Sequence, residues 1–263
     1  MVKPVFSKLS LKTRSMTMSV PRLLIAAAVI LSPVAMAGKK VAEPSLSAYE
    51  DAFRFTPVFS TAKSLTYADR TYQHTGLENF GISRAVFDLA IKGFEKLRAA
   101  GQASADSILT IVDFSKSSRE KRMVVIDLKK QDVLFHTVVA HGRNTGNEFA
   151  RSFSNLPRSH KSSLGFYLTR ETYQGSNGLS LKLDGMEKGF NDQALARAIV
   201  IHGAGYANEA VIGQKGYLGR SFGCPALPQR INRPVIETIK HGNVVFLYYP
   251  DQQYLQKSQL LNG

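Results

Sequence analysis

The residues beside the single cysteine of the chain favour a reactive thiol. Cys224 lies in the segment GRSFGCPA, residues 219–226, and a lone thiol forms no disulfide within the chain. A single cysteine is more often a small buried apolar residue than a nucleophile. Here Gly223 allows the tight turn that displays a side chain, and the positive charge of Arg220 favours the thiolate. We therefore predict that Cys224 is a nucleophile.

A thiol nucleophile needs a base, and His202 is the histidine best placed to serve as one. It ends the apolar run RAIVIH, residues 197–202, which is typical of a short buried strand, and Gly203 follows it. The end of a strand is a rigid platform with an exposed tip. No carboxylate stands out as a third catalytic group, so we expect the backbone carbonyl of Gly203 to orient the imidazole.

The chain has six histidines in all, and the other five are weaker candidates. His141 also ends a predicted strand, residues 133–140, and is the second candidate for the base. His136 falls within that strand, which indicates a partnered core or surface residue. The remaining three have no context that separates them from solvent-exposed side chains: His74, His160 and His241.

Pro225 limits the groups that could stabilise an oxyanion beside Cys224. In enzymes with a nucleophile elbow, the residue after the nucleophile donates its backbone N–H, but proline has none to donate. Local donors must therefore lie at or before the nucleophile, and the amides of Gly223 and Cys224 are the candidates. Loss of one such donor typically slows catalysis about a hundredfold or more.

The composition describes an ordinary globular protein with excess positive charge. Of 263 residues, 44% are hydrophobic and 21% are charged, and the formal net charge is +14. Such a charge favours anionic partners such as cell-wall polymer, lipid headgroups or nucleic acid, and it equally serves solubility. No nucleic-acid-binding motif is visible, and the histidines and acids lack the spacing of metal ligands. We expect no nucleic-acid partner, no metal and no other cofactor.

The elements that must position these residues change in kind along the chain. Apolar side chains recur at helical spacing over residues 85–100, so residues 38–104 are expected to form a helical N-terminal segment. Later β-branched runs separated by short polar turns predict strands. These runs are residues 108–114, 123–128, 133–140, 165–173, 180–183, 197–202 and 243–249.

The strand-rich part predicts one mainly-β catalytic domain over residues 105–252, followed by a C-terminal tail over 253–263. A helix is expected over residues 234–240, with Pro234 near its first turn and Gly242 after its end.

The first 37 residues have the character of an export signal. Basic residues precede the apolar run LLIAAAVIL, residues 23–31, and the tripeptide AMA, residues 35–37, offers small residues for a signal peptidase. The run is shorter than the roughly 20 residues that span a bilayer. We predict a signal peptide over residues 1–37 and no stable membrane insertion after cleavage; an uncleaved N-terminal anchor is the alternative.

The segment HGAGYANEAVIGQKGYLGRSFGCPALP, residues 202–228, resembles the catalytic domains of L,D-transpeptidases, often called YkuD-like. That family shows a histidine, a loop and then Ser/Thr-His-Gly-Cys, and here the corresponding motif is SFGC, residues 221–224. Three upstream pieces also resemble the murein L,D-transpeptidase branch, and together the similarity covers about residues 105–250. These pieces are AHGRNTG at 140–146, FSNLP at 153–157 and SSLGFYLT at 162–169.

The resemblance implies a YkuD-like antiparallel β-sandwich and a periplasmic or otherwise extracytoplasmic, cell-wall-associated enzyme. In that family the cysteine, here Cys224, is deprotonated by the histidine, here His202, and attacks the third residue of a peptidoglycan tetrapeptide stem. Terminal D-alanine leaves and a thioester remains. An amine from another stem or from a protein lysine then forms a cross-link. With water as the acceptor, the same acylation would make an L,D-carboxypeptidase.

The chain departs from the family pattern at two points. Phe222 stands where a second histidine is usual, which leaves open how the thiolate is stabilised and which acceptor is used. Pro225 and Ala226 replace the Arg or Asn that often follows the cysteine. The residues expected to contact the substrate are Arg220, Ser221, His141 and Arg143.

Two other classes of protein are left open by the sequence. A non-catalytic peptidoglycan-binding protein, in which Phe222 marks a lost active site, would bind the wall without acylation. An unrelated exported cysteine peptidase would cleave ordinary L-peptides. The sequence does not indicate an oligomeric state.

Overall fold

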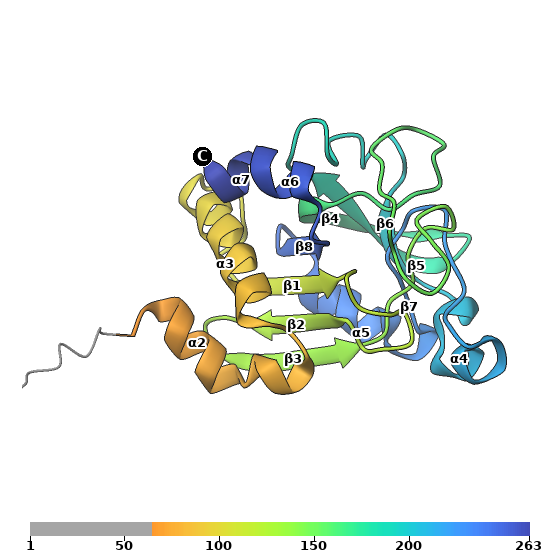
Figure 1. Cartoon of the computed structure of the whole chain (residues 1–263), viewed down its shortest axis with the longest axis horizontal. Coiled ribbons are helices and arrows are strands. Elements are labelled where there is room, and N and C mark those ends of the chain that lie inside the picture. Colours follow the sequence, from red (N-terminus) through yellow and green to blue (C-terminus); the bar gives the residue numbers. More distant parts are fainter. Residues whose placement is uncertain (1–64) are drawn as a thin grey trace, which may run out of the picture. The chain divides into compact units, whose positions relative to one another are not determined.

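The structure, a computed structural model, describes residues 65–263. The expected signal peptide, and the expected helical segment as far as residue 64, lie outside the described residues. Eight strands form one continuous sheet in the order β3-β2-β1-β8-β4-β5-β6-β7 (Figure 1). The mainly-β prediction is therefore confirmed, and the described part of the N-terminal segment is helical as expected.

The strands are β1 (Ile108–Asp113), β2 (Met123–Asp127), β3 (Asp132–Thr137), β4 (Gly165–Gly175), β5 (Gly178–Gly185), β6 (Val200–Gly203), β7 (Ala226–Leu227) and β8 (Val244–Tyr248). The helices are α2 (Tyr67–Thr75), η2 (Leu77–Phe80), α3 (Arg84–Ala99), η3 (Gly205–Ala207), α4 (Glu209–Lys215), α5 (Gln229–Ile239), α6 (Gln252–Lys257) and α7 (Gln259–Asn262). Within residues 65–263 no helix has both the length and the apolar character needed to cross a bilayer.

The strand pairing is mixed, whereas the resemblance implied an antiparallel arrangement. The meander β1-β2-β3 is antiparallel, as its short polar turns predict, and β4 pairs antiparallel with both β5 and β8. The pairs β1–β8 and β6–β7 are parallel. Every residue of β1 and β2 is buried, which explains their continuous apolar runs, because both faces of these strands are covered.

Helix α3 packs its apolar stripe against the sheet. Ser83 caps its start, since the Ser83 hydroxyl accepts a hydrogen bond from the Val86 amide at 3.3 Å. The predicted stripe is buried in the main core, and its members are Phe87, Ile91, Phe94 and Leu97. A Cβ atom on Gly93 would collide with the Phe166 ring of β4, so this glycine lets the helix approach the sheet closely.

Several element boundaries differ from the sequence prediction, among them the end of β3 at Thr137, and two of the differences have a clear physical cause. Helix α5 begins at Gln229, so Pro234 lies inside it and not in its first turn. The proline lacks the N–H that would bond the Arg230 carbonyl, but Val235 and Ile239 are fully buried and hold the helix to the core. Strand β6 begins at Val200 and not at residue 197, because Ala198 has a φ of 52°, which interrupts extended backbone.

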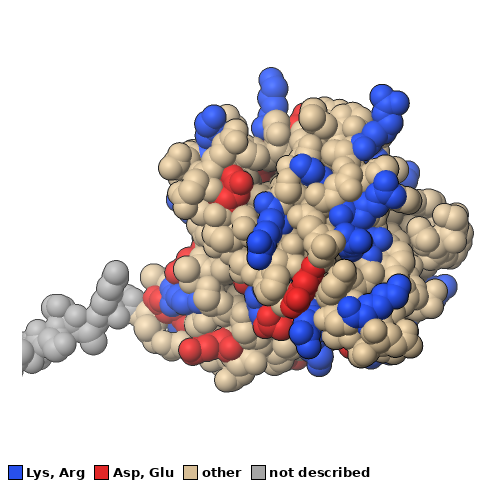
Figure 2. Space-filling model, turned by 45° about the vertical axis from the view of Figure 1, so that its right-hand side comes forward, with Lys and Arg blue, Asp and Glu red and all other residues tan. Residues whose placement is uncertain are grey.

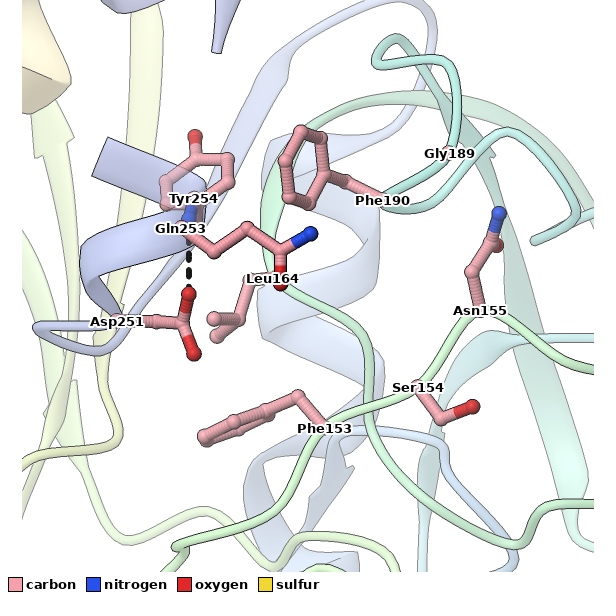
Figure 3. A pocket seen from close by; sticks show the side chains of 9 residues that line it. All are labelled: Phe153, Ser154, Asn155, Leu164, Gly189, Phe190, Asp251, Gln253 and Tyr254. Atoms are coloured by element: carbon pink, nitrogen blue, oxygen red, sulfur yellow. Dashed lines mark hydrogen bonds between the residues drawn. The ribbon is translucent and has the colours of Figure 1, made fainter. Parts of the chain in front are cut away.

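The last residues, expected to form a tail, form the packed helices α6 and α7. Asp251 caps α6 by accepting a hydrogen bond from the Tyr254 amide at 2.8 Å, drawn as the dashed line in Figure 3. The buried Glu187 carboxylate accepts hydrogen bonds from the Tyr254 hydroxyl at 2.9 Å and from the Ser258 hydroxyl. Since α7 also packs against α3, the helices at both ends of the described chain share one core with the sheet.

Candidate active site

The pairing of β6 with β7 places the loop that carries Cys224 beside the strand that carries His202. His202 lies in β6 between two neighbours, paired with Ser180 of β5 and Ala226 of β7. Cys224 precedes Ala226 by two residues, on the loop that enters β7. Because the β6–β7 pair is parallel, the cysteine loop runs beside the start of β6. The two residues are 22 positions apart in the sequence, and the pairing of β6 with β7 brings their segments side by side.

The Cys224 thiol is half-buried against the residues that lead into β6. Its Sγ lies 3.5 Å from the Val200 amide nitrogen, which donates to it, and 3.7 Å from the Ala198 carbonyl oxygen. Burial raises the pKa of the Cys224 thiol, and the Val200 amide and the Arg197 charge act in the opposite direction. Burial therefore favours the neutral thiol, whereas the Val200 amide and the Arg197 charge favour the thiolate.

His202 is buried and oriented by its own strand. Its Nδ1 lies 3.0 Å from the Gly203 carbonyl oxygen, and a carbonyl only accepts, so Nδ1 carries the proton. In the neutral imidazole, Nε2 then has a free lone pair that can take a proton. Burial lowers the pKa of His202, which favours this neutral form.

The loop that carries Cys224 is closed by the Ser221 hydroxyl. The Gly223 amide donates to Ser221 Oγ at 3.0 Å, and Ser221 Oγ donates to the Cys224 carbonyl at 2.6 Å. Of the two amides expected to stabilise an oxyanion, that of Gly223 is thus engaged. The Cys224 amide, which interacts with its own sulfur, is the remaining candidate.

The loop after β3 supports the loop that carries Cys224. The Gly142 amide donates to Ser162 Oγ, and Ser162 Oγ donates to the Gly223 carbonyl, both at 3.0 Å. Gly142 and Ser221 also form an isolated parallel bridge. Gly223 has a φ of +128°, a region that other residues avoid. The position before the nucleophile therefore requires glycine for its backbone conformation.

His141 is buried with both ring nitrogens engaged. Its Nδ1 lies 2.7 Å from Nη2 of Arg122, which donates, and its Nε2 lies 3.3 Å from the Gly146 carbonyl. Burial, reinforced by the Arg122 charge, lowers the pKa of His141 to about 3. Hence the imidazole is neutral and has no nitrogen available for the Cys224 thiol.

The two arginines expected at the substrate lie on exposed loop surface. Arg220 Nη1 donates to the Arg143 carbonyl at 3.2 Å and to Asn147 Oδ1 at 2.6 Å, so it braces the loop after His141. The Arg143 guanidinium lies 5.1 Å from the centre of the Phe222 ring. Phe222 is 63% exposed, and its other ring neighbour is His160 at 4.7 Å.

Three residues that support the candidate site could not be recognised from the sequence around them. Arg197 belongs to the run predicted as a strand, Ser162 lies in a Ser-rich loop, and Arg122 ends the polar turn before a predicted strand. Each acts through partners far along the chain: Ser162 bonds Gly223, 61 positions away. The periodicity of apolar residues predicts local helices and strands, so it does not reveal contacts between distant segments.

The cavity in Figure 3 lies apart from these residues. Figure 3 shows Phe190 and Tyr254 at one side and Phe153 at the other. Its full lining is Phe153, Ser154, Asn155, Leu164, Gly189, Phe190, Asp251, Gln253 and Tyr254, which includes none of the predicted site residues. Among the described residues, no three His, Cys, Asp or Glu side chains are grouped so that they could hold a metal ion.

Positive charge is prominent on one face of the molecule. Figure 2 shows Lys and Arg side chains spread over the right-hand part of that view, where Asp and Glu are sparse. Separately from that view, the sequence of the loop after β3, between residues 141 and 163, has four basic residues and one acidic residue: Arg143, Arg151, Arg158, Lys161 and Glu148. An anionic ligand would be attracted to such a surface.

A family model described as the L,D-transpeptidase catalytic domain matches residues 78–248. The chain therefore belongs to the L,D-transpeptidase catalytic domain family. The match begins in η2 and ends with β8, so it includes α3 as well as the sheet. No curated protein matches the chain.

Solved structures of L,D-transpeptidases are similar at low identity. An L,D-transpeptidase from Mycobacterium smegmatis is 12% identical with a TM-score of 0.34, over 54% of this chain and 59% of that one. One from Stackebrandtia nassauensis is 12% identical with a TM-score of 0.34, over 70% and 76%. The helical cell shape determining protein Pgp2 from Campylobacter jejuni is 12% identical with a TM-score of 0.37, over 61% and 56%. The chain thus spans 59% of the Mycobacterium smegmatis protein.

Proposed function

We propose that the protein is a cysteine-dependent L,D-transpeptidase that acts on peptidoglycan tetrapeptide stems outside the cytoplasm. The observation that carries the proposal is the pairing of β6 with β7, which sets the only cysteine of the chain beside a buried histidine within the family match. A thiol, an imidazole with a free nitrogen and a nearby backbone N–H support the proposal, because acyl transfer requires a nucleophile, a proton acceptor and an oxyanion donor.

In the acylation step, His202 Nε2 takes the proton of the Cys224 thiol, and the resulting thiolate attacks the carbonyl carbon of the third stem residue. The Cys224 amide stabilises the oxyanion that forms. The bond to D-alanine then breaks, and the leaving amine takes a proton from protonated His202 Nε2, so a thioester and free D-alanine result. The Gly203 carbonyl keeps the imidazole in the orientation that presents Nε2.

In the second step, an amine from another stem attacks the thioester. His202 accepts the proton that this amine loses, the C–S bond breaks, and the thiolate is restored with a new amide cross-link. With water as the acceptor, the product is a free tripeptide carboxylate and the enzyme is an L,D-carboxypeptidase. Both outcomes share the acylation step, so the products distinguish them.

The experiment is a product analysis of purified tetrapeptide muropeptides incubated with the protein. Mass spectrometry is expected to show D-alanine release together with cross-linked dimers, or with tripeptides in the hydrolytic case. Cys224→Ala is expected to release none. Equal release by Cys224→Ala would contradict the proposal.

A carbapenem provides a second test of the same nucleophile. We expect one adduct of the drug on Cys224 by intact mass spectrometry. A protein that is retained on peptidoglycan but forms no adduct and no product would instead be a wall-binding protein.

The location and domain limits are part of the proposal. Activity on peptidoglycan requires export, and the signal predicted over residues 1–37 would supply it; N-terminal sequencing of the secreted protein tests the cut. We further propose that the described helices support the catalytic domain, because α3, α6 and α7 pack into the core of the sheet.

A further inference from the structure

The guanidinium of Arg197 lies against the loop that carries the thiol. A Cβ atom on Gly223 would be 3.3 Å from Arg197 Nη2, so the cation lies close to the residue before Cys224. The thiol itself contacts the next residues of the same segment, the Ala198 carbonyl and the Val200 amide. One short segment, residues 197–200, therefore surrounds the sulfur with a charge, a carbonyl and an amide.

The Arg197 side chain is fixed by neutral partners. Nη1 donates to the Ser154 carbonyl at 2.9 Å and to Ser163 Oγ at 3.2 Å. Nη2 donates to the Lys161 carbonyl at 2.5 Å and to Ser159 Oγ at 3.3 Å. Within residues 65–263 no ion pair joins Arg197 to a carboxylate, although nine pairs join other side chains there. The positive charge is held in place without being neutralised.

The other titratable groups near the thiol are neutral. Burial raises the pKa of Tyr206 to about 12 and also raises that of Tyr167, which lies near Arg197. Burial lowers the pKa of His202. At neutral pH these three side chains carry no charge, and Arg197 is the cation that acts on the sulfur. Its charge opposes the effect of burial on the Cys224 pKa.

We propose that Arg197 is a positioning residue whose fixed positive charge stabilises the negative charge that develops on the Cys224 sulfur when His202 takes the thiol proton. The proposal rests on the role of Cys224 as the nucleophile. It assigns separate tasks to two side chains: the arginine stabilises the negative sulfur, and the histidine takes the thiol proton and then gives it to the leaving amine.

The test is the rate of Cys224 alkylation by iodoacetamide as a function of pH, with Arg197→Gln and Arg197→Lys beside the wild type. An opposite charge within about 4–6 Å of a titrating group lowers its pKa by about one unit or more. We expect Arg197→Gln to move the pH midpoint up by about one unit and to slow alkylation roughly tenfold at pH 7. Arg197→Lys should restore most of the shift, and all three proteins should approach similar rates at high pH.

A purely structural role for Arg197 gives another result. If the side chain only held the loop over residues 154–163, Arg197→Gln would alter the limiting rate at high pH or the melting temperature and leave the midpoint in place. An unchanged midpoint in Arg197→Gln overturns the inference.

Two further variants separate Arg197 from its neighbours. Arg220→Gln removes a guanidinium whose partners lie in the loop after His141, and His202→Gln removes the imidazole. Both should leave the midpoint within a few tenths of a unit of the wild type. A shift in either one as large as that of Arg197→Gln would overturn the inference.

The assay uses no muropeptide, so it distinguishes the inference from the proposed function. A protein that leaves muropeptides unchanged but shows the Arg197→Gln shift contradicts the transpeptidase proposal and supports the arginine effect. A protein that releases D-alanine but lacks the Arg197→Gln shift supports the transpeptidase proposal and contradicts the arginine effect.

Discussion

Gly142 and Gly223 touch backbone to backbone, since a Cβ atom on Gly142 would lie 3.0 Å from the Cα atom of Gly223. The same atom would lie 2.6 Å from the His160 carbonyl oxygen. The contact joins the loop after β3 to the loop that carries Cys224, and Ser162 bonds both glycines across it. The position of the nucleophile therefore depends on a loop that comes about 80 residues earlier in the chain.

Gly142→Ala should disturb this contact. The added methyl group has no room, so the cysteine loop must move, and we expect the free energy of unfolding to fall by about 1–3 kcal/mol. Alkylation or carbapenem acylation of Cys224 should slow at least tenfold. The matched control is Gly213→Ala in α4, where a Cβ meets open space and the helix gains about 0.5–1 kcal/mol. Wild-type stability and rate in Gly142→Ala would show that the contact is dispensable.

Ser221→Ala should loosen the turn at the nucleophile. The hydroxyl makes two hydrogen bonds within the loop, each worth about 1 kcal/mol, and their loss should slow carbapenem acylation roughly tenfold because the thiol is less well placed. Ser221→Thr keeps the hydroxyl and should recover most of the rate. Ser176→Ala in the exposed β4–β5 turn is the control. Equal rates in Ser221→Ala and the wild type would argue against a role for this hydroxyl.

His202→Gln should separate proton transfer from thiolate reactivity. We expect D-alanine release to fall by about 10²–10⁴-fold, as is typical when a general acid–base is lost, while iodoacetamide still modifies Cys224. His141→Asn should release D-alanine at a reduced but measurable rate, because its ring faces Arg122 and not the thiol. If His141→Asn were the inactive variant and His202→Gln the active one, the base would be His141.

His141 should make stability depend on pH. The unfolded chain binds a proton at this residue below about pH 6.5, but the buried imidazole, with a pKa of about 3, does not. The unfolded state therefore holds more protons between about pH 3 and pH 6.5, and stability falls as pH decreases through that window. The slope from this residue is at most about 1.4 kcal/mol per pH unit.

Urea denaturation of the wild type and His141→Asn at several pH values measures this slope. The variant lacks the titrating ring, so its stability should fall less steeply from pH 6.5 towards pH 4, even though it is less stable at pH 7. Parallel curves for the two proteins would mean that His141 is protonated in the folded state.

Much of the fold follows from short-range patterns. The stripe of α3, the polar turns of the β1-β2-β3 meander and the apolar run of β8 each predict their element within a few residues. The parallel pairing of β1 with β8 does not follow from such patterns, because it joins segments at opposite ends of the domain. The start of α5 was also missed, since a proline in a helix interior is normally unfavourable and here the packing of Val235 outweighs it.

The candidate site was predictable in its chemistry and less so in its supports. A lone cysteine after glycine and a histidine at a strand end indicate nucleophile and base by residue type. The setting of His141 depends on Arg122, 19 positions away, and no local pattern records that contact. Arg197 was hidden within a predicted strand, and Arg220 stood nearer to Cys224 in sequence although its side chain braces another loop.

The place of β8 in the sheet has a consequence for the order of folding. This strand lies between β1 and β4, and Asn243 just before it bonds Ile108, 135 positions earlier. The sheet cannot close until the chain has been made as far as β8, and pairings this distant form slowly. The growing chain is thus expected to stay without its central strand until residues 244–248 have been made. It also means that a chain truncated before β8 should aggregate or be degraded and should not yield a smaller working domain.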